Sequence, residues 1–176
     1  MAAITTETST RPIHRIAREQ LASSGFLLAR LGFAFKGKAI AAFEKAGFEL
    51  YDYGVLALLA EGARETQSTI ADALTVDPSR MVALLDSLEK RGLIVRQRDQ
   101  QDRRRHVVSI TAAGKKELGR LRSLIKQLEE EFFAPLDDES RKALHGLLFH
   151  LATELDPRCA FAAVTPPTVA APRRSA

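Results

Sequence analysis

Three consecutive arginines, Arg103 to Arg105, stand between a polar stretch and an alternating apolar run in the segment DQQDRRRHVVSIT. Guanidinium groups bind phosphates and can also donate two parallel hydrogen bonds to one guanine. Charged side chains beside a strand can instead form a solvated edge that discourages aggregation. The segments on either side of the arginines are needed to decide between these alternatives.

The flanking runs LIVRQR and HVVSIT are rich in β-branched residues and have the length of strands. Joined by the polar stretch, they predict a β-hairpin with a basic tip. Cationic residues crowd into this region, and only Asp99 and Asp102 oppose them within it. The cationic residues are Lys90, Arg91, Arg96, Arg98, Arg103, Arg104 and Arg105. Because cationic contacts to phosphates supply most sequence-independent affinity for nucleic acid, we interpret the hairpin as a DNA-binding element.

The segment before the hairpin, DPSRMVALLDSLEKRGL, predicts a helix with clear ends. Asp77 can cap it, Pro78 occupies its first position and Gly92 ends it. The i, i+3, i+4, i+7 spacing places four apolar residues on one face: Met81, Leu84, Leu85 and Leu88. The opposite face carries Ser79, Arg80, Ala83, Asp86, Ser87 and Lys90, with Val82 near the boundary. This outward face is our candidate for contacts with bases.

A shorter helix, TQSTIADAL, precedes this one with Thr66 as its N-cap. Two helices joined by a short turn make a helix-turn-helix, and the basic hairpin then acts as a wing. Such a unit places its second helix in the major groove and its wing on the backbone or in the minor groove. There Arg80 can bind guanine and Val82 can contact a thymine methyl group.

Long amphipathic helices flank this unit. Apolar spacing predicts one helix over residues 16–46 that ends at Gly47, a second over ELYDYGVLALLA, and two more over residues 112–133 and 138–155. The fold class is therefore mainly α with a small β-hairpin. Residues 47–111 form the predicted winged segment, and residues 16–46 with 112–155 form the predicted helical dimerisation region. Residues 1–15 and 156–176 are expected to be flexible tails.

Several classes of protein are disfavoured. No nucleophile elbow, phosphate-binding loop or paired-carboxylate motif appears, so we do not expect an enzyme or a cofactor. Cys159 is the only cysteine, and His145 and His150 are five residues apart, so no metal site is expected. The chain also lacks a signal-peptide core and any run of about 18 apolar residues, which predicts a cytoplasmic protein without membrane contact.

The segment DRRRHVVSIT followed by AAG resembles the wing signature of MarR-type winged helix-turn-helix regulators. The matching positions are Asp102, Arg104, Val108, Thr111 and Gly114. DPSRMVALLDSLEKRGLIVR is similar to the recognition helix and first wing strand of that family, and TQSTIADAL to its first helix of the motif. The resemblance covers about residues 17–155, which leaves only the two terminal segments outside it.

The resemblance implies an obligate homodimer that binds a palindromic operator in double-stranded DNA. It implies that Asp102 holds the wing arginines by charge-assisted hydrogen bonds. It implies that Ser79, Arg80, Val82 and Ala83 face the bases and that Arg104 lies at the wing tip. The helix face and the basic stretch add the other candidate DNA-binding residues, Ser87, Lys90, Arg98, Arg103 and Arg105. Where relatives often carry polar or basic residues, this chain has Val82, Ala83 and Ser87, which favours recognition of DNA shape and wing contacts over hydrogen bonds to bases.

Relatives commonly bind small aromatic or phenolic acids between the helical region and the winged segment. By resemblance this site would use Arg30, Phe33, Phe48, Tyr51 and Tyr53, although aromatic residues at helix junctions are often ordinary core. The predicted function is thus a repressor released by a small aromatic ligand. The alternatives are a DNA-binding regulator that has no ligand and a helical interaction module that does not bind DNA.

Overall fold

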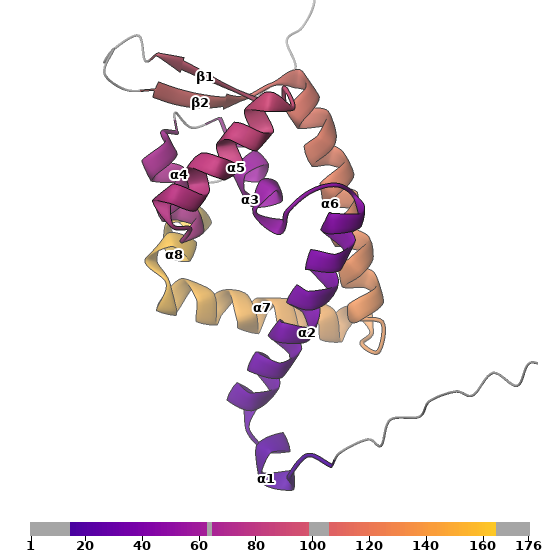
Figure 1. The fold of residues 1–176 in the computed structure, drawn as a ribbon. Coiled ribbons are helices and arrows are strands. Elements are labelled where there is room, and N and C mark those ends of the chain that lie inside the picture. Colours follow the sequence, from indigo (N-terminus) through magenta and orange to yellow (C-terminus); the bar gives the residue numbers. More distant parts are fainter. Residues whose placement is uncertain (1–14, 63–64, 99–105, 165–176) are drawn as a thin grey trace, which may run out of the picture. The chain divides into compact units, whose positions relative to one another are not determined.

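The computed structural model describes residues 15–62, 65–98 and 106–164. It confirms a mainly helical chain with one antiparallel hairpin in the described part (Figure 1). The helices are α1 (Arg18–Leu21), α2 (Ser24–Lys45), α3 (Leu50–Ala60), α4 (Gln67–Leu74), α5 (Pro78–Lys90), α6 (Ala112–Phe132), α7 (Asp138–Leu155) and α8 (Pro157–Val164). The strands are β1 (Ile94–Arg98) and β2 (His106–Ile110).

The chain divides into two compact units, residues 1–37 and residues 38–176. The first unit holds α1 and the beginning of α2, where the sequence predicted one uninterrupted helix from residue 16. That prediction is wrong at Ala22 and Ser23, where the helix breaks. The Ser23 hydroxyl accepts a hydrogen bond from the amide of Phe26 at 3.2 Å. A serine that satisfies a free amide in this way starts a new helix, which explains the break.

The second unit contains the hydrophobic core, and its members come from the end of α2, from α3 to α5, from the hairpin and from α6. Its most deeply buried large side chains are Phe43, Val55, Leu56, Ile70, Met81, Leu85, Leu88, Ile94, Val108, Leu118 and Leu121. As predicted, α2 and α5 end near glycines, Gly47 and Gly92, which have positive φ, and α3 ends in the same way near Gly62. Because the buried side chains come from both parts, the winged segment and α6 share one core.

A single threonine joins the hairpin to α6. The Thr111 hydroxyl donates a hydrogen bond to the carbonyl oxygen of Gly92 at 2.7 Å and accepts one from the amide of Gly114 at 3.0 Å. A Cβ atom on Gly114 would lie 2.1 Å from the Leu93 carbonyl oxygen. Only glycine therefore allows the first turn of α6 to lie directly against the start of β1.

The end of the chain differs from the prediction. Residues from 156 onward were expected to form a flexible tail, but residues 157–164 form α8. Asp156 accepts a hydrogen bond from the amide of Arg158 at 3.0 Å, and Pro157 occupies the first helical position. Aspartate followed by proline favours the start of a helix. Within the described residues, none of the helices is long and apolar enough to cross a membrane.

Candidate nucleic-acid interface

Helix α5, the predicted recognition helix, starts at a well-defined cap. The Asp77 carboxylate accepts hydrogen bonds from the Ser79 hydroxyl, from the Ser79 amide at 2.8 Å and from the Arg80 amide at 3.4 Å. These bonds hold the pKa of Asp77 below its ordinary value, and the bond from the Ser79 hydroxyl has the largest effect. The cap and Pro78 confirm the predicted start and fix the first turn, which carries two of the predicted base-contacting residues.

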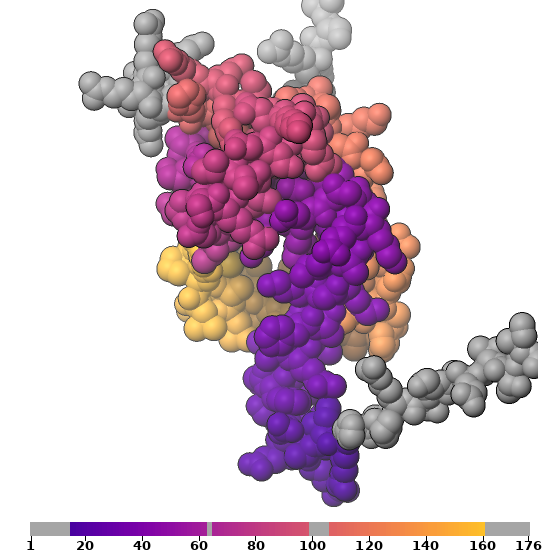
Figure 2. Space-filling model, in the orientation of Figure 1, coloured from indigo at the N-terminus to yellow at the C-terminus, as the bar shows by residue number. Residues whose placement is uncertain are grey.

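The two faces of α5 separate as predicted. Met81, Leu84, Leu85 and Leu88 are buried in the core. The outward face is exposed and carries Ser79, Arg80, Val82, Ala83, Asp86, Ser87 and Lys90. In the space-filling view, α5 and the adjoining hairpin, coloured magenta to pink, lie next to one another on the visible face of this unit (Figure 2). An exposed helix face beside a hairpin fits the shape of a DNA-binding surface.

The side chain of Arg80 is held by the beginning of α3. Its Nη2 atom lies 3.2 Å from a carboxylate oxygen of Glu49, and its guanidinium lies over the Tyr51 ring, 4.9 Å from the ring centroid. Both charged side chains are more than half exposed, so this ion pair contributes little to stability. It does orient the guanidinium, and a base bound by Arg80, as predicted, would have to compete with Glu49 for one of its donors.

A second arginine, at the end of α5, lies against the same part of the chain. The Arg91 guanidinium is 3.9 Å from the centroid of the Phe48 ring, and its Nη1 atom is 3.7 Å from the Asp52 carboxylate. Asp52 is buried, and burial raises the pKa of its carboxyl, against the opposing effects of a hydrogen bond from the Glu49 amide and of the Arg91 charge. Arg91 thus fixes α5 on α3.

The hairpin is tied to α5 by Arg96. β1 pairs with β2 so that Arg96 lies opposite Val108. The Arg96 Nη1 atom donates to Asp86 at 2.5 Å and to Glu89 at 3.2 Å, and the Arg96 amide donates to Glu89 at 2.9 Å. Asp99 and Asp102 are the only acidic residues within the basic stretch of the sequence, but other acidic residues oppose its cations in the fold. The acidic partners of Arg91 and Arg96 lie on α3 and α5.

Other cations of the predicted surface remain exposed. Lys90 and Arg98 are exposed at the ends of α5 and β1. Asp102 and the three arginines of the wing tip, Arg103 to Arg105, lie outside the described residues. The base of the wing is fixed to the chain two residues before α4, since the Val108 amide donates to the Glu65 carbonyl oxygen at 2.8 Å. The contacts of all these residues with DNA stay a prediction.

The five residues of the predicted ligand site fall in both compact units. Arg30 and Phe33 are exposed in the first unit. In the second unit, Phe48 is buried beneath Arg91, Tyr51 lies beneath Arg80, and Tyr53 packs edge-on against Phe43 with ring centroids 5.8 Å apart. Phe48 also lines a cavity of about 370 Å³ together with Ala46, Glu117, Arg120, Leu121 and Leu124. The ligand site stays a prediction.

Sequence reasoning missed the residues that orient the cations. Glu49 pairs with Arg80 and Glu89 with Arg96, each from another element. Arg158, a cation that contacts the end of α4, was missed as well. No local pattern identifies such pairs, because exposed carboxylates and arginines are common on every helix. For Arg158 a local signal did exist. Asp156 and Pro157 indicate the start of its helix, in the same way that Asp77 and Pro78 indicate the start of α5.

Comparison with known proteins agrees with this geometry. The model of the MarR family matches residues 51–106, which run from α3 to the start of β2. A putative transcriptional regulatory protein for the hcr operon of Thauera aromatica is 33% identical over 135 residues, which are 72% of this chain and 81% of that protein.

Solved structures show the same fold. The transcriptional repressor CouR bound to a 23-mer DNA duplex superimposes with a TM-score of 0.68 and 28% identity, over 79% of this chain and 99% of that one. CouR from Rhodococcus jostii RHA1 bound to p-coumaroyl-CoA gives a TM-score of 0.62 and 29% identity, over 77% of this chain and 96% of that one.

Proposed function

Because the chain belongs to the MarR family of winged helix-turn-helix transcriptional regulators, we propose that it is a homodimeric repressor, which binds a palindromic operator and is released by a small aromatic ligand. The observation that carries DNA binding is the capped and exposed outer face of α5 beside the hairpin. The DNA-bound structure of the related repressor CouR supports this proposal over an interaction module that does not bind DNA.

Dimerisation is supported by apolar side chains that this chain leaves exposed. Leu28, Leu31 and Phe33 are exposed in the first unit, and Leu147 and Leu151 are exposed on α7 in the second. Large exposed apolar surfaces mark sites of association. Since one winged segment presents a modest surface, we expect high affinity to need two half-sites about one helical turn apart.

The first experiment selects bound duplexes from a random library and measures their affinity at several salt concentrations. Arg104→Ala should weaken binding to all sequences and lower the salt slope by about 0.9 for each lost phosphate contact. Arg80→Ala should instead relax the preference at one base pair in each half-site, by roughly 1–3 kcal/mol. Equal effects of both variants on all operator sequences would contradict these roles, and recovery of no duplex would contradict DNA binding.

The ligand proposal extends from CouR, whose bound p-coumaroyl-CoA carries an aromatic acyl group. A ligand releases DNA only if it binds one arrangement of the two recognition helices better than the other. A coupling of roughly 1–3 kcal/mol would weaken operator binding about 5- to 150-fold. Arg30 is the proposed carboxylate partner, because a guanidinium can form two parallel hydrogen bonds with a carboxylate.

The second experiment titrates benzoate-like acids and p-coumaroyl-CoA against the operator complex. The proteins compared are the wild type, Arg30→Ala and Arg18→Ala, which removes a similarly exposed arginine from α1. With the benzoate-like acids, the wild type and Arg18→Ala should release the operator, but Arg30→Ala should not. p-Coumaroyl-CoA has a thioester in place of the carboxylate, so any release that it causes should not depend on Arg30. If the acids release the operator equally from all three proteins, Arg30 has no role, and if neither kind of ligand releases it, the regulator acts without such a ligand.

A further inference from the structure

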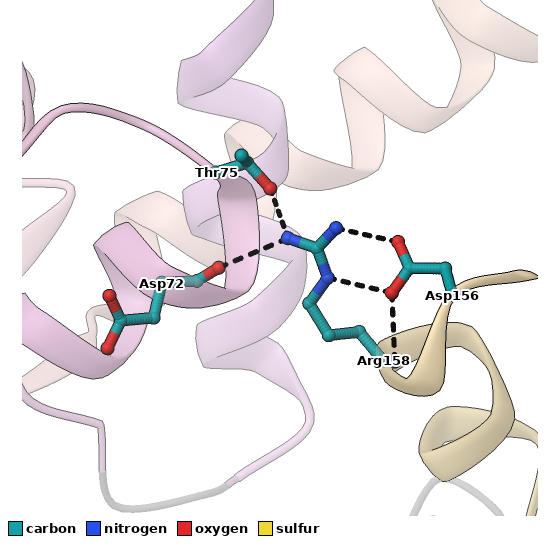
Figure 3. A network of polar contacts seen from close by, with 4 residues as sticks. All are labelled: Asp72, Thr75, Asp156 and Arg158. Carbon is teal, nitrogen blue, oxygen red and sulfur yellow. Dashed lines mark hydrogen bonds and ion pairs between the residues drawn. The ribbon is translucent and has the colours of Figure 1, made fainter.

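The C-terminal helix α8 contacts the helix-turn-helix through Arg158 (Figure 3). The Nε and Nη2 atoms of Arg158 donate to the two carboxylate oxygens of Asp156 at 2.8 Å and 2.7 Å. Its Nη1 atom donates to the Thr75 hydroxyl and to the carbonyl oxygen of Asp72, which is 3.4 Å away. The guanidinium thus joins the end of α7 to the end of α4.

The contacted turn sets the direction of the recognition helix. Asp72 lies in the last turn of α4, and Thr75 and Val76 form the connection to the cap of α5. Among the non-glycine residues that the structure describes, Thr75 alone has a positive φ, 52°. A β-branched residue rarely adopts this conformation, so surrounding contacts must hold it. Arg158 supplies such a contact and places a positive charge at the C-terminal end of α4.

The arrangement of the guanidinium favours a positioning role over a role in global stability. Arg158 is about half exposed, and exposed ion pairs stabilise folded proteins only weakly. However, its two parallel hydrogen bonds with Asp156 fix the plane of the guanidinium, so that its remaining Nη1 atom is directed at the Thr75 hydroxyl. A lysine has no such plane and cannot bind Asp156 and Thr75 in the same way.

We propose that α8 is a strap, in which Arg158 positions the helix-turn-helix relative to α7 and thereby sets the spacing of the two recognition helices in the dimer. The inference rests on the proposed dimeric, DNA-binding function. The winged segment is already joined to the helical region by the chain at both of its ends, and it shares a core with Phe43 of α2 and with Leu118 of α6. Arg158 adds a further contact, from α8 to the C-terminal end of α4, far along the chain from both of these connections. This added contact limits rotation of the winged segment.

The test compares affinity for the selected operator with affinity for the same operator carrying one extra base pair between its half-sites. The insertion turns one half-site by about 34° relative to the other. The wild type should discriminate strongly between the two duplexes. Arg158→Ala should lower this discrimination by about fivefold or more, with a similar melting temperature, and Arg158→Lys should not restore it. Arg122→Ala, which removes an exposed arginine from α6, should behave like the wild type.

Two variants at Thr75 test the same contact without changing α8. Thr75→Ser keeps the hydroxyl and should keep the discrimination, whereas Thr75→Ala should lose it, with no further loss when combined with Arg158→Ala. Hydrogen exchange at the Val76 amide should also become faster in Arg158→Ala. Unchanged discrimination in Arg158→Ala and Thr75→Ala would overturn the strap alone. A wild type that binds no duplex would overturn the proposed function and the strap with it.

Discussion

Helices α5 and α7 both carry a stripe of apolar residues, but only α5 buries it. The stripe of α5 includes Leu85, which is fully buried in the core. α7 has no buried residue, and Leu147, Leu151 and Leu155, spaced four apart on one face, are 65%, 50% and 80% exposed. One copy of the chain therefore completes the core of the winged segment and leaves the face of α7 without a cover. The winged segment is thus packed by intrachain contacts, while the exposed face of α7 is where the proposed homodimer would bury its apolar side chains.

The largest expected effect concerns the buried stripe. Leu85→Ala should lower the free energy of unfolding by about 2–5 kcal/mol, because a cavity remains where the side chain is lost. Val82→Ala on the exposed face of α5 should change it far less. Urea denaturation followed by circular dichroism measures both variants. Equal losses in the free energy of unfolding for the two variants would contradict the division of α5 into a buried and an exposed face.

The next effect concerns the exposed stripe. Leu151→Lys should weaken dimerisation by at least about 30-fold, the equivalent of roughly 2 kcal/mol for a central interface residue. The helix content of the chain should remain. Lys142→Glu changes a charge on the opposite side of α7, nine residues or two and a half turns away, and should have little effect. Sedimentation equilibrium measures both, and a dimer unaffected by Leu151→Lys would place the interface elsewhere.

A smaller effect distinguishes two glycines of α6. Gly114→Ala should cost about 1–3 kcal/mol, because the added Cβ would lie 2.1 Å from the Leu93 carbonyl oxygen and 2.8 Å from Ile110 Cγ1. Gly119→Ala meets nothing within 4 Å and should stabilise the helix by about 0.5–1 kcal/mol. Thermal unfolding measures the two changes, and their signs should be opposite if α6 packs on the hairpin at only one of these positions.

The smallest expected effect is the pH dependence due to the charge buried in the winged segment. Burial raises the pKa of Asp52 above 3.8, so its contribution to stability is fully present below pH 3.8 and is lost as pH rises through the folded-state pKa. Relative to the wild type, Asp52→Asn should therefore gain stability as pH rises through that range. Urea unfolding at several pH values checks this.

Asp77→Asn is the matched control with the opposite sign. Hydrogen bonds lower the pKa of Asp77, so its contribution is present above pH 3.8 and is lost as pH falls through the folded-state pKa. The wild type should therefore lose its advantage over Asp77→Asn as the solution becomes more acidic. The same trend with pH in both variants would be inconsistent with a buried Asp52 and an exposed, hydrogen-bonded Asp77.

Local signals account for what the sequence predicted. Asp77 with Pro78 predicted the start of α5, and apolar spacing predicted its buried face, because capping and amphipathicity act within a few residues. The same local signal at Asp156 and Pro157 was misinterpreted as part of a tail, owing to the Pro- and Ala-rich sequence that follows. Contacts such as Arg80 with Glu49 could not be predicted, since their partners come together only when the helices pack.

The hydroxyl of Thr111 has a practical meaning for anyone who builds chimeric regulators. It both closes the hairpin on Gly92 and caps α6 at Gly114, so the boundary between the wing and the following helix is a shared hydrogen-bonding unit. A graft cut at the end of β2 would separate the threonine from one of its partners. The exchangeable module should extend through Gly114, so that the donor wing carries with it the first turn on which it rests.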